Sequence, residues 1–422
     1  MRCLAKVLSV AVLACMVAAL AASAFVKAKT KHGLFCDLNL RYSEICCSHE
    51  GVNPFWVWER ELSHPRYKGL ERHDKPDDPS SDKMKVHAYP PWHTTLFWWY
   101  PWLPRGLVLW GMFAFNLAAF VSVGVYFARK FPLESFFDRA IFCLCGFLPC
   151  AYLWGSHLDT GNYPLFVLSA AFLMVFSLRR GRDVLAGLFW SLMMVKPQMA
   201  TLAFWPLFLA RRFKTIATAV AVVCAATLLP AYVYGESPLE LILQVPRMGM
   251  PYMQEGISSG LMAVPGFSWM TANEKSHVCV AVVGFLSCGV LCAIFAKSRS
   301  WIVRFMPALI MIPVWTYSLP QDRTVFLCLY FPFGLIGFSY AQRLWGERAK
   351  LVFYAVVAVV AATVGFFPML AAAGVFFGFL GDEAVACTYR IWQSVLFALA
   401  CTAFACVAFN IRKVDNLQPS LP

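Results

Sequence analysis

The chain has 422 residues, of which 60% are hydrophobic and 14% are charged, and its formal net charge is +13. Its mean hydropathy is +0.61. Soluble domains are about 45–50% apolar and about 25% charged, so this composition excludes a water-soluble enzyme, a secreted disulfide scaffold and a disordered chain. Apolar stretches long enough to cross a hydrocarbon core of about 30 Å recur along the chain and predict a polytopic membrane protein.

The apolar stretches predict an all-α bundle of about twelve transmembrane helices. The expected spans are 7 to 26, 106 to 128, 140 to 154, 163 to 178, 184 to 195, 198 to 210, 215 to 234, 277 to 296, 305 to 318, 324 to 341, 351 to 371 and 391 to 410. The first stretch also fits a cleaved signal peptide, because Arg2 and Lys6 precede it and Ala22-Ser23-Ala24 follows.

The spans divide the chain into six regions. We expect a first transmembrane helix (1–26), an outer loop (27–104), a transmembrane core (105–234) with a short re-entrant-like hairpin (184–210), a second outer loop (235–276), C-terminal transmembrane helices (277–410) and a cytoplasmic tail (411–422). Trp and Tyr are dense in residues 89–104, which is typical of the membrane–water boundary, so this part of the large first loop is expected to be interfacial.

Basic residues are concentrated between alternate spans. Of the 36 Lys and Arg residues, 19 lie in the clusters Arg2/Lys6, Arg129/Lys130/Arg139, Arg179/Arg180/Arg182, Arg211/Arg212/Lys214, Lys297/Arg299/Arg304, Arg343/Arg348/Lys350 and Arg412/Lys413. The rest of the chain is close to neutral. This positive-inside pattern predicts that the clusters and both termini lie on the cytoplasmic side of a plasma or inner membrane. Binding to nucleic acid is not needed to explain the charge.

The 16 cysteines do not form an obvious disulfide framework, because most lie within predicted spans, where Cys behaves as a small apolar residue. Four are expected outside: Cys36, Cys46, Cys47 and Cys387. Cys36 either forms a bridge with Cys46 or Cys47, or all of these remain free thiols.

Asp37 follows the first predicted helix by about ten residues. A carboxylate near the outer membrane surface can accept a proton from an acceptor hydroxyl, as a general base does. The same residue also fits a cap for the helical segment that follows, and the sequence pattern around it favours that interpretation.

Lys196-Pro197-Gln198 lies midway between two basic clusters, so the arms on either side of it are short. About fourteen residues of helix rise only about 21 Å, so this hairpin barely reaches the far side of a bilayer. An ammonium group at its tip suits a phosphate or diphosphate, and short interrupted helices often mark binding sites in membrane bundles. The alternative is a lysine that extends to the outer headgroups.

The turn Leu319-Pro320-Gln321-Asp322-Arg323 is a third candidate, as a possible acid–base ion pair on the outer side or as a plain solvated turn. Weaker candidates lie in the other outer connections, where ordinary loop residues are the favoured interpretation: His157, Asp159, Arg247, Gln254, Glu255 and Ser258.

In order and sidedness these motifs resemble glycosyltransferase family 87 of the GT-C superfamily, whose members use polyprenyl-phosphate sugars. The matching elements are Asp37 with Tyr42, Gly51-Val52-Asn53-Pro54-Phe55, Tyr89-Pro90-Pro91, Gly161-Asn162, Arg179-Arg180-Gly181-Arg182, Ala186-Gly187, Lys196-Pro197 and Arg211-Arg212. The similarity covers about residues 7 to 215 well. Related enzymes often carry a His-containing turn late in the chain, where this sequence has Gln321-Asp322-Arg323.

The resemblance implies an inverting sugar transfer on the outer face, with Asp37 as the catalytic base in place of a cap. The donor would be mannose or a related hexose or pentose on a polyprenyl phosphate, and the acceptor a lipid or polysaccharide. Lys196 is the first candidate to stabilise the leaving phosphate, with Arg323 and Arg247 next. One carboxylate suffices, because phosphate leaves without protonation, whereas a glycosidase uses two.

Further substrate contacts are expected from Asp322, Tyr42, Asn53, Tyr89, Asn162 and Gln198. No cofactor is expected, and Asp322 or Asp159 would be the first ligands of a divalent metal. A transporter or lipid-carrier flippase is the alternative function, but it should show paired halves with matching helix breaks, which the sequence lacks.

Overall fold

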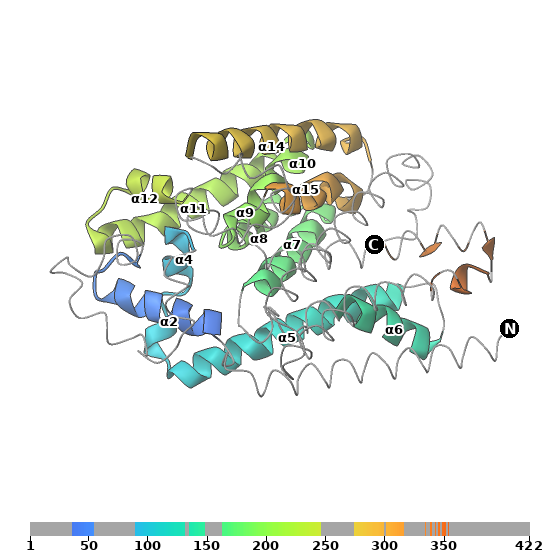
Figure 1. Ribbon diagram of the computed structural model, residues 1–422, viewed down its shortest axis with the longest axis horizontal. Coiled ribbons are helices and arrows are strands. Elements are labelled where there is room, and N and C mark those ends of the chain that lie inside the picture. Colours follow the sequence, from blue (N-terminus) through green and yellow to red (C-terminus); the bar gives the residue numbers. More distant parts are fainter. Residues whose placement is uncertain are drawn as a thin grey trace, which may run out of the picture.

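The computed structural model of the chain (Figure 1) describes residues 36–54, 89–130, 135–147, 163–245, 274–298 and 301–315, with single positions between 334 and 353. Within these residues every regular element is a helix, which confirms the all-helical prediction for this part of the chain. The helices are α2 (Cys36–His49), α4 (Pro91–Leu96), η5 (Tyr100–Trp102), α5 (Arg105–Lys130), α6 (Phe136–Phe147), α7 (Pro164–Arg179), α8 (Asp183–Met193), α9 (Pro197–Ala200), η6 (Thr201–Ala203), α10 (Phe204–Leu209), α11 (Phe213–Tyr234), α12 (Pro238–Gln244), α14 (Glu274–Phe295) and α15 (Trp301–Trp315).

Two of the described helices are long and apolar enough to cross a membrane, α5 over Arg105–Arg129 and α11 over Phe213–Tyr234. Only 24% and 22% of their most apolar windows are buried within the protein. Apolar helices that expose most of their surface suit a hydrocarbon environment, so a polytopic membrane bundle is plausible. The predicted spans at 7 to 26 and 391 to 410, and most of those at 324 to 341 and 351 to 371, lie outside the described residues, and the total of twelve stays a prediction.

The predicted short hairpin is formed by α8 on one side and α9, η6 and α10 on the other, with Lys196 in the turn between them. Pro197 occupies the first turn of α9, where a proline costs no intrahelical hydrogen bond. The indole Nε1 of Trp190 donates to the carbonyl oxygen of Ala200 at 2.9 Å and joins the two arms. With 11 residues, α8 rises only about 16 Å.

Helix α8 packs against both α7 and α11 at the centre of the bundle. Gly187 permits the close approach to α11, because a Cβ atom at this position would lie 2.6 Å from Thr218 Cβ and 2.7 Å from the carbonyl oxygen of Thr215. One large apolar core connects α7, α8, α10, α14 and α15 around these contacts. Direct packing therefore holds these helices in position relative to one another.

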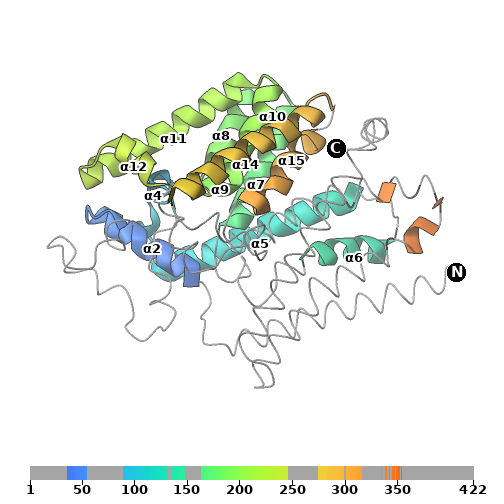
Figure 2. The same cartoon turned by 45° about the horizontal axis from the view of Figure 1, so that its top comes forward.

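A second, smaller core lies where α2 meets the aromatic segment. It includes Leu38 and Ile45 of α2, Phe97 after α4, Tyr163 before α7 and Val195 at the hairpin tip. Figures 1 and 2 both show α2, α4 and α12 together at one end of the molecule, beside the C-terminal end of α11. At this end, α2 and α4 therefore lie near segments from much later in the chain, namely Tyr163, the hairpin tip at Val195, and α12 with the end of α11.

The aromatic segment has one buried and one exposed side. Trp92, Phe97 and Tyr100 are buried, whereas Trp102 is 69% exposed and the nearby Trp110 of α5 is 57% exposed. The exposed indoles suit a membrane–water boundary and the buried rings fasten the segment to the bundle. The interfacial position predicted for residues 89–104 stays a prediction.

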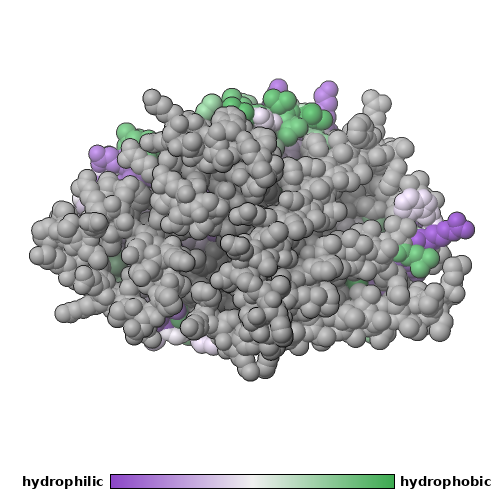
Figure 3. Space-filling model, in the orientation of Figure 1, coloured by the Kyte–Doolittle hydropathy of each residue, from purple (hydrophilic) through white to green (hydrophobic). Residues whose placement is uncertain are grey.

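Exposed apolar side chains also cover α14. They include Val282, Val283, Leu286, Val290 and Ile294. Figure 3 shows hydrophobic residues along the upper edge of the view, where Figure 1 places α14. Such a continuous apolar face on one helix matches contact with lipid.

Candidate active site

Two cationic side chains meet at the ring of Tyr89, at the end of the bundle where α2 and α4 lie. Arg41 Cζ lies 4.7 Å from the centre of this ring, and Lys196 Nζ lies 5.4 Å from it. All three side chains are at least nine-tenths buried, with exposed fractions of 4% for Arg41, 5% for Lys196 and 4% for Tyr89. The geometry is that of a double cation–π contact, which is strongest when the cations are desolvated.

Arg41 is also paired with Glu44, one turn further along α2, through Arg41 Nη1 and Glu44 Oε1. Buried charges are costly unless they are paired or hydrogen bonded, and this carboxylate offsets one of the two cations. Two buried cations therefore lie side by side at this ring, and cations in such a position suit an anionic group.

Asp37 belongs to the same helix as Arg41. Its backbone is already helical, since α2 includes Cys36, so it is not the residue immediately before the helix. Positions four residues apart share one face of an α-helix, so the register of position 37 matches that of Arg41 and not the opposite face of α2. The side chain of Asp37 lies outside the described part of the structure.

Aromatic packing holds Tyr89 in place. Its ring meets Tyr163 edge-on at 5.1 Å and His93 at 4.8 Å between centroids. Tyr163 in turn stacks on Phe97 at 4.7 Å and shares a hydroxyl hydrogen bond of 3.1 Å with Tyr100. Interlocking rings of this kind leave Tyr89 little freedom, so the positions of the two cations follow from packing.

A hydrogen bond fixes the hairpin tip to α4. The indole Nε1 of Trp92 donates to the carbonyl oxygen of Met194 at 2.7 Å, two residues before Lys196. The aromatic segment thus determines where the tip stands, and through it where the ammonium group lies. Gln198, also predicted as a substrate contact, is half-buried in α9 just beyond the tip.

Asn53 lies in the chain segment that follows α2 and contacts the far end of α11. Its amide Nδ2 donates to Glu236 Oε1 at 2.9 Å and to Gln244 Oε1 at 3.3 Å, and Gln244 donates to Glu236 at 3.0 Å. Nearby, Ser48 and Tyr234 share a hydroxyl hydrogen bond of 2.7 Å. These contacts join α2 to the end of α11 and to α12, and binding of substrate by Asn53 stays a prediction.

Tyr42 lies on α2 next to the start of α5. Its hydroxyl donates to the carbonyl oxygen of Leu103 at 3.3 Å, and Arg105 Cζ lies 5.8 Å from its ring. Burial raises the pKa of the Tyr42 phenol, and the neighbouring Cys46 raises it further. The hydroxyl therefore stays protonated at neutral pH and acts as a hydrogen-bond donor.

Neither Cys46 nor Cys47 forms a disulfide. Burial raises the pKa of the Cys46 thiol, with a further contribution from the carboxylate of Glu50. No group of three or more His, Cys, Asp or Glu side chains that could hold a metal is found within the described residues.

Several predicted residues lie outside the described residues: Asn162, Arg247, Asp322 and Arg323, with the weaker candidates His157, Asp159, Gln254, Glu255 and Ser258. Of the predicted site residues, the structure brings Lys196 and Tyr89 together, and Tyr42 belongs to the same small core. The sequence does not point to Arg41 and Glu44, because charged residues in a predicted outer loop indicate a solvated segment. Their spacing of four and seven residues from Asp37 is the signal that could have identified them.

The model of glycosyltransferase family 87 matches residues 87–316. The chain belongs to glycosyltransferase family 87. Members of this family are glycosyltransferases and membrane proteins, which confirms the predicted family and the general class of activity. Neither a search of curated proteins nor a search of solved structures gave a match.

The matched part of this family 87 glycosyltransferase contains Tyr89, the hairpin and Lys196, but it begins after α2. Asp37, Arg41 and Asn53 are therefore outside the match. Their connection with the family region rests on packing, through the contact of Arg41 with Tyr89.

Proposed function

We propose that this family 87 member transfers a sugar, mannose or a related hexose or pentose, from a polyprenyl phosphate to a lipid or polysaccharide acceptor on the outer face of the membrane. The observation that carries the proposal is the meeting of Arg41 and Lys196 at Tyr89. It supplies buried positive charge beside the helix that bears Asp37.

The phosphate of the donor binds at these cations. Lys196 contributes an ammonium group at the tip of the hairpin, and Arg41 contributes a planar fork of donors that matches phosphate oxygens. In a buried site, charge–charge attraction is stronger than in water, so the two cations stabilise the negative charge that develops on the leaving phosphate. Glu44, paired with Arg41, offsets part of this positive charge.

Asp37 acts as the general base. It accepts the proton of the acceptor hydroxyl, whose oxygen forms a bond to the anomeric carbon as the bond from this carbon to the phosphate oxygen breaks. The polyprenyl phosphate leaves as an anion and needs no proton. Attack from the face opposite the phosphate inverts the anomeric configuration.

The reaction takes place on the side of the membrane away from the basic clusters. Helix α11 begins next to Arg211 and Arg212 and ends beside Asn53, and its 22 residues span about 33 Å. That length separates the basic connections from the end of the bundle that holds Tyr89 by roughly one bilayer core. If the basic side is cytoplasmic, the site faces outward.

The first test uses membranes that contain the full-length chain, with labelled polyprenyl-phosphate mannose, glucose and arabinose as donors. We expect one label to move to a lipid or polysaccharide fraction. Asp37→Asn should fold and retain donor binding but lose at least about a hundredfold in turnover, because general-base catalysis contributes about 10²–10⁴-fold.

Lys196→Gln is the second variant and should weaken donor binding as well as turnover, whereas Lys196→Arg should retain part of both. A matched control is Lys297→Gln, which removes an exposed cation from the opposite end of the bundle and should leave turnover unchanged. Donor flux across the membrane that persists in Asp37→Asn without any sugar transfer would instead identify a transporter.

A further inference from the structure

Within the described residues, a strongly basic surface outside the proposed site lies at two turns on the other side of the bundle. One joins α7 to α8 and the other joins α10 to α11. Their exposed cations are Arg179, Arg180, Arg182, Arg211 and Lys214. The turns are adjacent because α8 packs against both α7 and α11.

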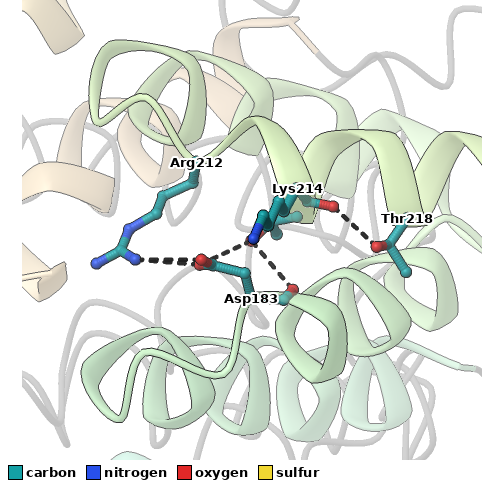
Figure 4. A network of polar contacts seen from close by, with 5 residues as sticks. Asp183, Arg212, Lys214 and Thr218 are labelled. Carbon is teal, nitrogen blue, oxygen red and sulfur yellow. Dashed lines mark hydrogen bonds and ion pairs between the residues drawn. The ribbon is translucent and has the colours of Figure 1, made fainter.

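Asp183 connects the two turns. Its carboxylate lies 3.1 Å from Arg212 Nη1, and Figure 4 shows this contact across the two turns. The same carboxylate accepts a hydrogen bond of 3.3 Å from the hydroxyl of Thr215. Asp183 is the one carboxylate in segments 179–183 and 210–214. Because Arg212 engages it, it does little to offset the five exposed cations around it.

Apolar side chains continue directly from these cations. Phe176, Val184 and Phe213 are exposed next to the turns, and the guanidinium of Arg180 stacks on the ring of Phe176 at 4.0 Å. A surface that places cations beside exposed apolar helix faces can bind a charged headgroup and its acyl chains at once.

Arg211 has an unfavourable backbone conformation. Its φ of 57° is left-handed, and it is the one non-glycine residue with positive φ among the described residues. The corresponding position of the α7–α8 turn is Gly181, with φ 69°. Glycine is the residue favoured at a left-handed position after a helix C-terminus. Arg211 therefore places a cation at a position whose backbone conformation favours glycine.

We propose that these two turns form a binding site for an anionic phospholipid, with its phosphate at the cations and its acyl chains along α7, α8 and α11. Each cation near an anionic lipid surface strengthens binding by about fivefold. The proposal does not depend on the reaction at Tyr89, because its readout is lipid binding and thermal stability without donor or acceptor.

The experiment uses the full chain, purified and placed in nanodiscs of phosphatidylcholine with increasing phosphatidylglycerol. Lipid retention is measured by native mass spectrometry, and the melting temperature is measured in parallel. In the triple variant Arg180→Gln, Arg211→Gln and Lys214→Gln, we expect phosphatidylglycerol to bind on the order of a hundredfold more weakly than in the wild type. A matched control, Arg129→Gln with Lys297→Gln and Arg348→Gln, removes three exposed cations from other connections and should bind like the wild type.

Arg211→Gly separates the lipid role from a structural one and remains informative if the triple variant fails to fold. It should raise the melting temperature in phosphatidylcholine, because it relieves the left-handed backbone, yet bind phosphatidylglycerol about fivefold more weakly. Equal loss of binding in the control triple variant would mean a general charge effect and would overturn the proposal. An equal rise in melting temperature with inorganic phosphate alone would also overturn it.

Discussion

At the scale of single residues, the decisive feature is a pair of buried cations on one aromatic ring. Neither Arg41 nor Lys196 reaches bulk water, and both contact the face of Tyr89. Desolvation removes the competition from water, so the attraction between these cations and an arriving anion is screened less than at the surface. A surface lysine of the same charge would be screened by salt and would bind a phosphate only weakly.

The Cys46 thiol gives a residue-scale prediction with a defined pH dependence. Because its pKa is raised, a smaller fraction is thiolate at neutral pH than for an ordinary exposed cysteine, and thiolate is the reactive form. We expect slow maleimide labelling of Cys46 at pH 7, with a rate that keeps rising above the pH at which an ordinary thiol levels off. The measurement is mass spectrometry of the Cys46 peptide from pH 7 to pH 10. A rate that levels off at the same pH as that of an ordinary exposed thiol would contradict the shifted pKa.

At the scale of elements, the short hairpin determines where the site lies. Helix α8 ends after 11 residues, so its tip stops inside the bundle and meets the aromatic segment from the first loop. Trp92 then fixes the tip by its hydrogen bond to Met194. If α8 were long enough to cross the whole membrane, Lys196 would lie beyond Tyr89, near the lipid headgroups.

Gly187 gives the prediction at this scale. Replacement with alanine places a Cβ atom 2.6 Å from Thr218 Cβ and against the backbone of Thr215, so α8 and α11 must move apart. Overpacking of this kind costs about 1–3 kcal/mol of unfolding free energy, which a lower melting temperature in detergent would report. Gly111→Ala is the matched control, since nothing lies within 4 Å of its new Cβ atom, and it should leave the melting temperature unchanged or slightly higher.

At the scale of the whole molecule, the bundle has two chemically different ends. One carries exposed basic turns and exposed apolar helix faces, and the other carries the buried cations and the aromatic segment. The length of α11 keeps them about 33 Å apart. Recognition of lipid on one side and sugar transfer on the other would therefore use separate surfaces.

Membrane sidedness is the prediction at this scale. In intact cells, an impermeant maleimide should label Leu239→Cys in α12 but label Lys297→Cys only after permeabilisation, because positively charged connections remain in the cytoplasm. Both positions are exposed in the structure. The peptide that carries each new cysteine is followed separately, with the wild-type chain as the background. The reverse labelling pattern would turn the site to the cytoplasmic side and contradict the proposed topology.

Length and hydropathy alone predict a membrane protein, helices close to α5, α7 and α11, and a turn at Lys196. These are local properties, since the length and hydropathy of a stretch decide whether it can cross a bilayer as a helix. The family motifs are local too, and the family match over residues 87–316 confirms the predicted family.

Three features of the site arise only when the chain is folded. Arg41 of α2 meets Lys196 at Tyr89, part of the aromatic segment is buried, and Asn53 contacts Glu236. Burial of a charged residue in an outer loop depends on which distant helices pack over it. Hydropathy in one window carries no information about such contacts, because they arise between segments far apart in the chain.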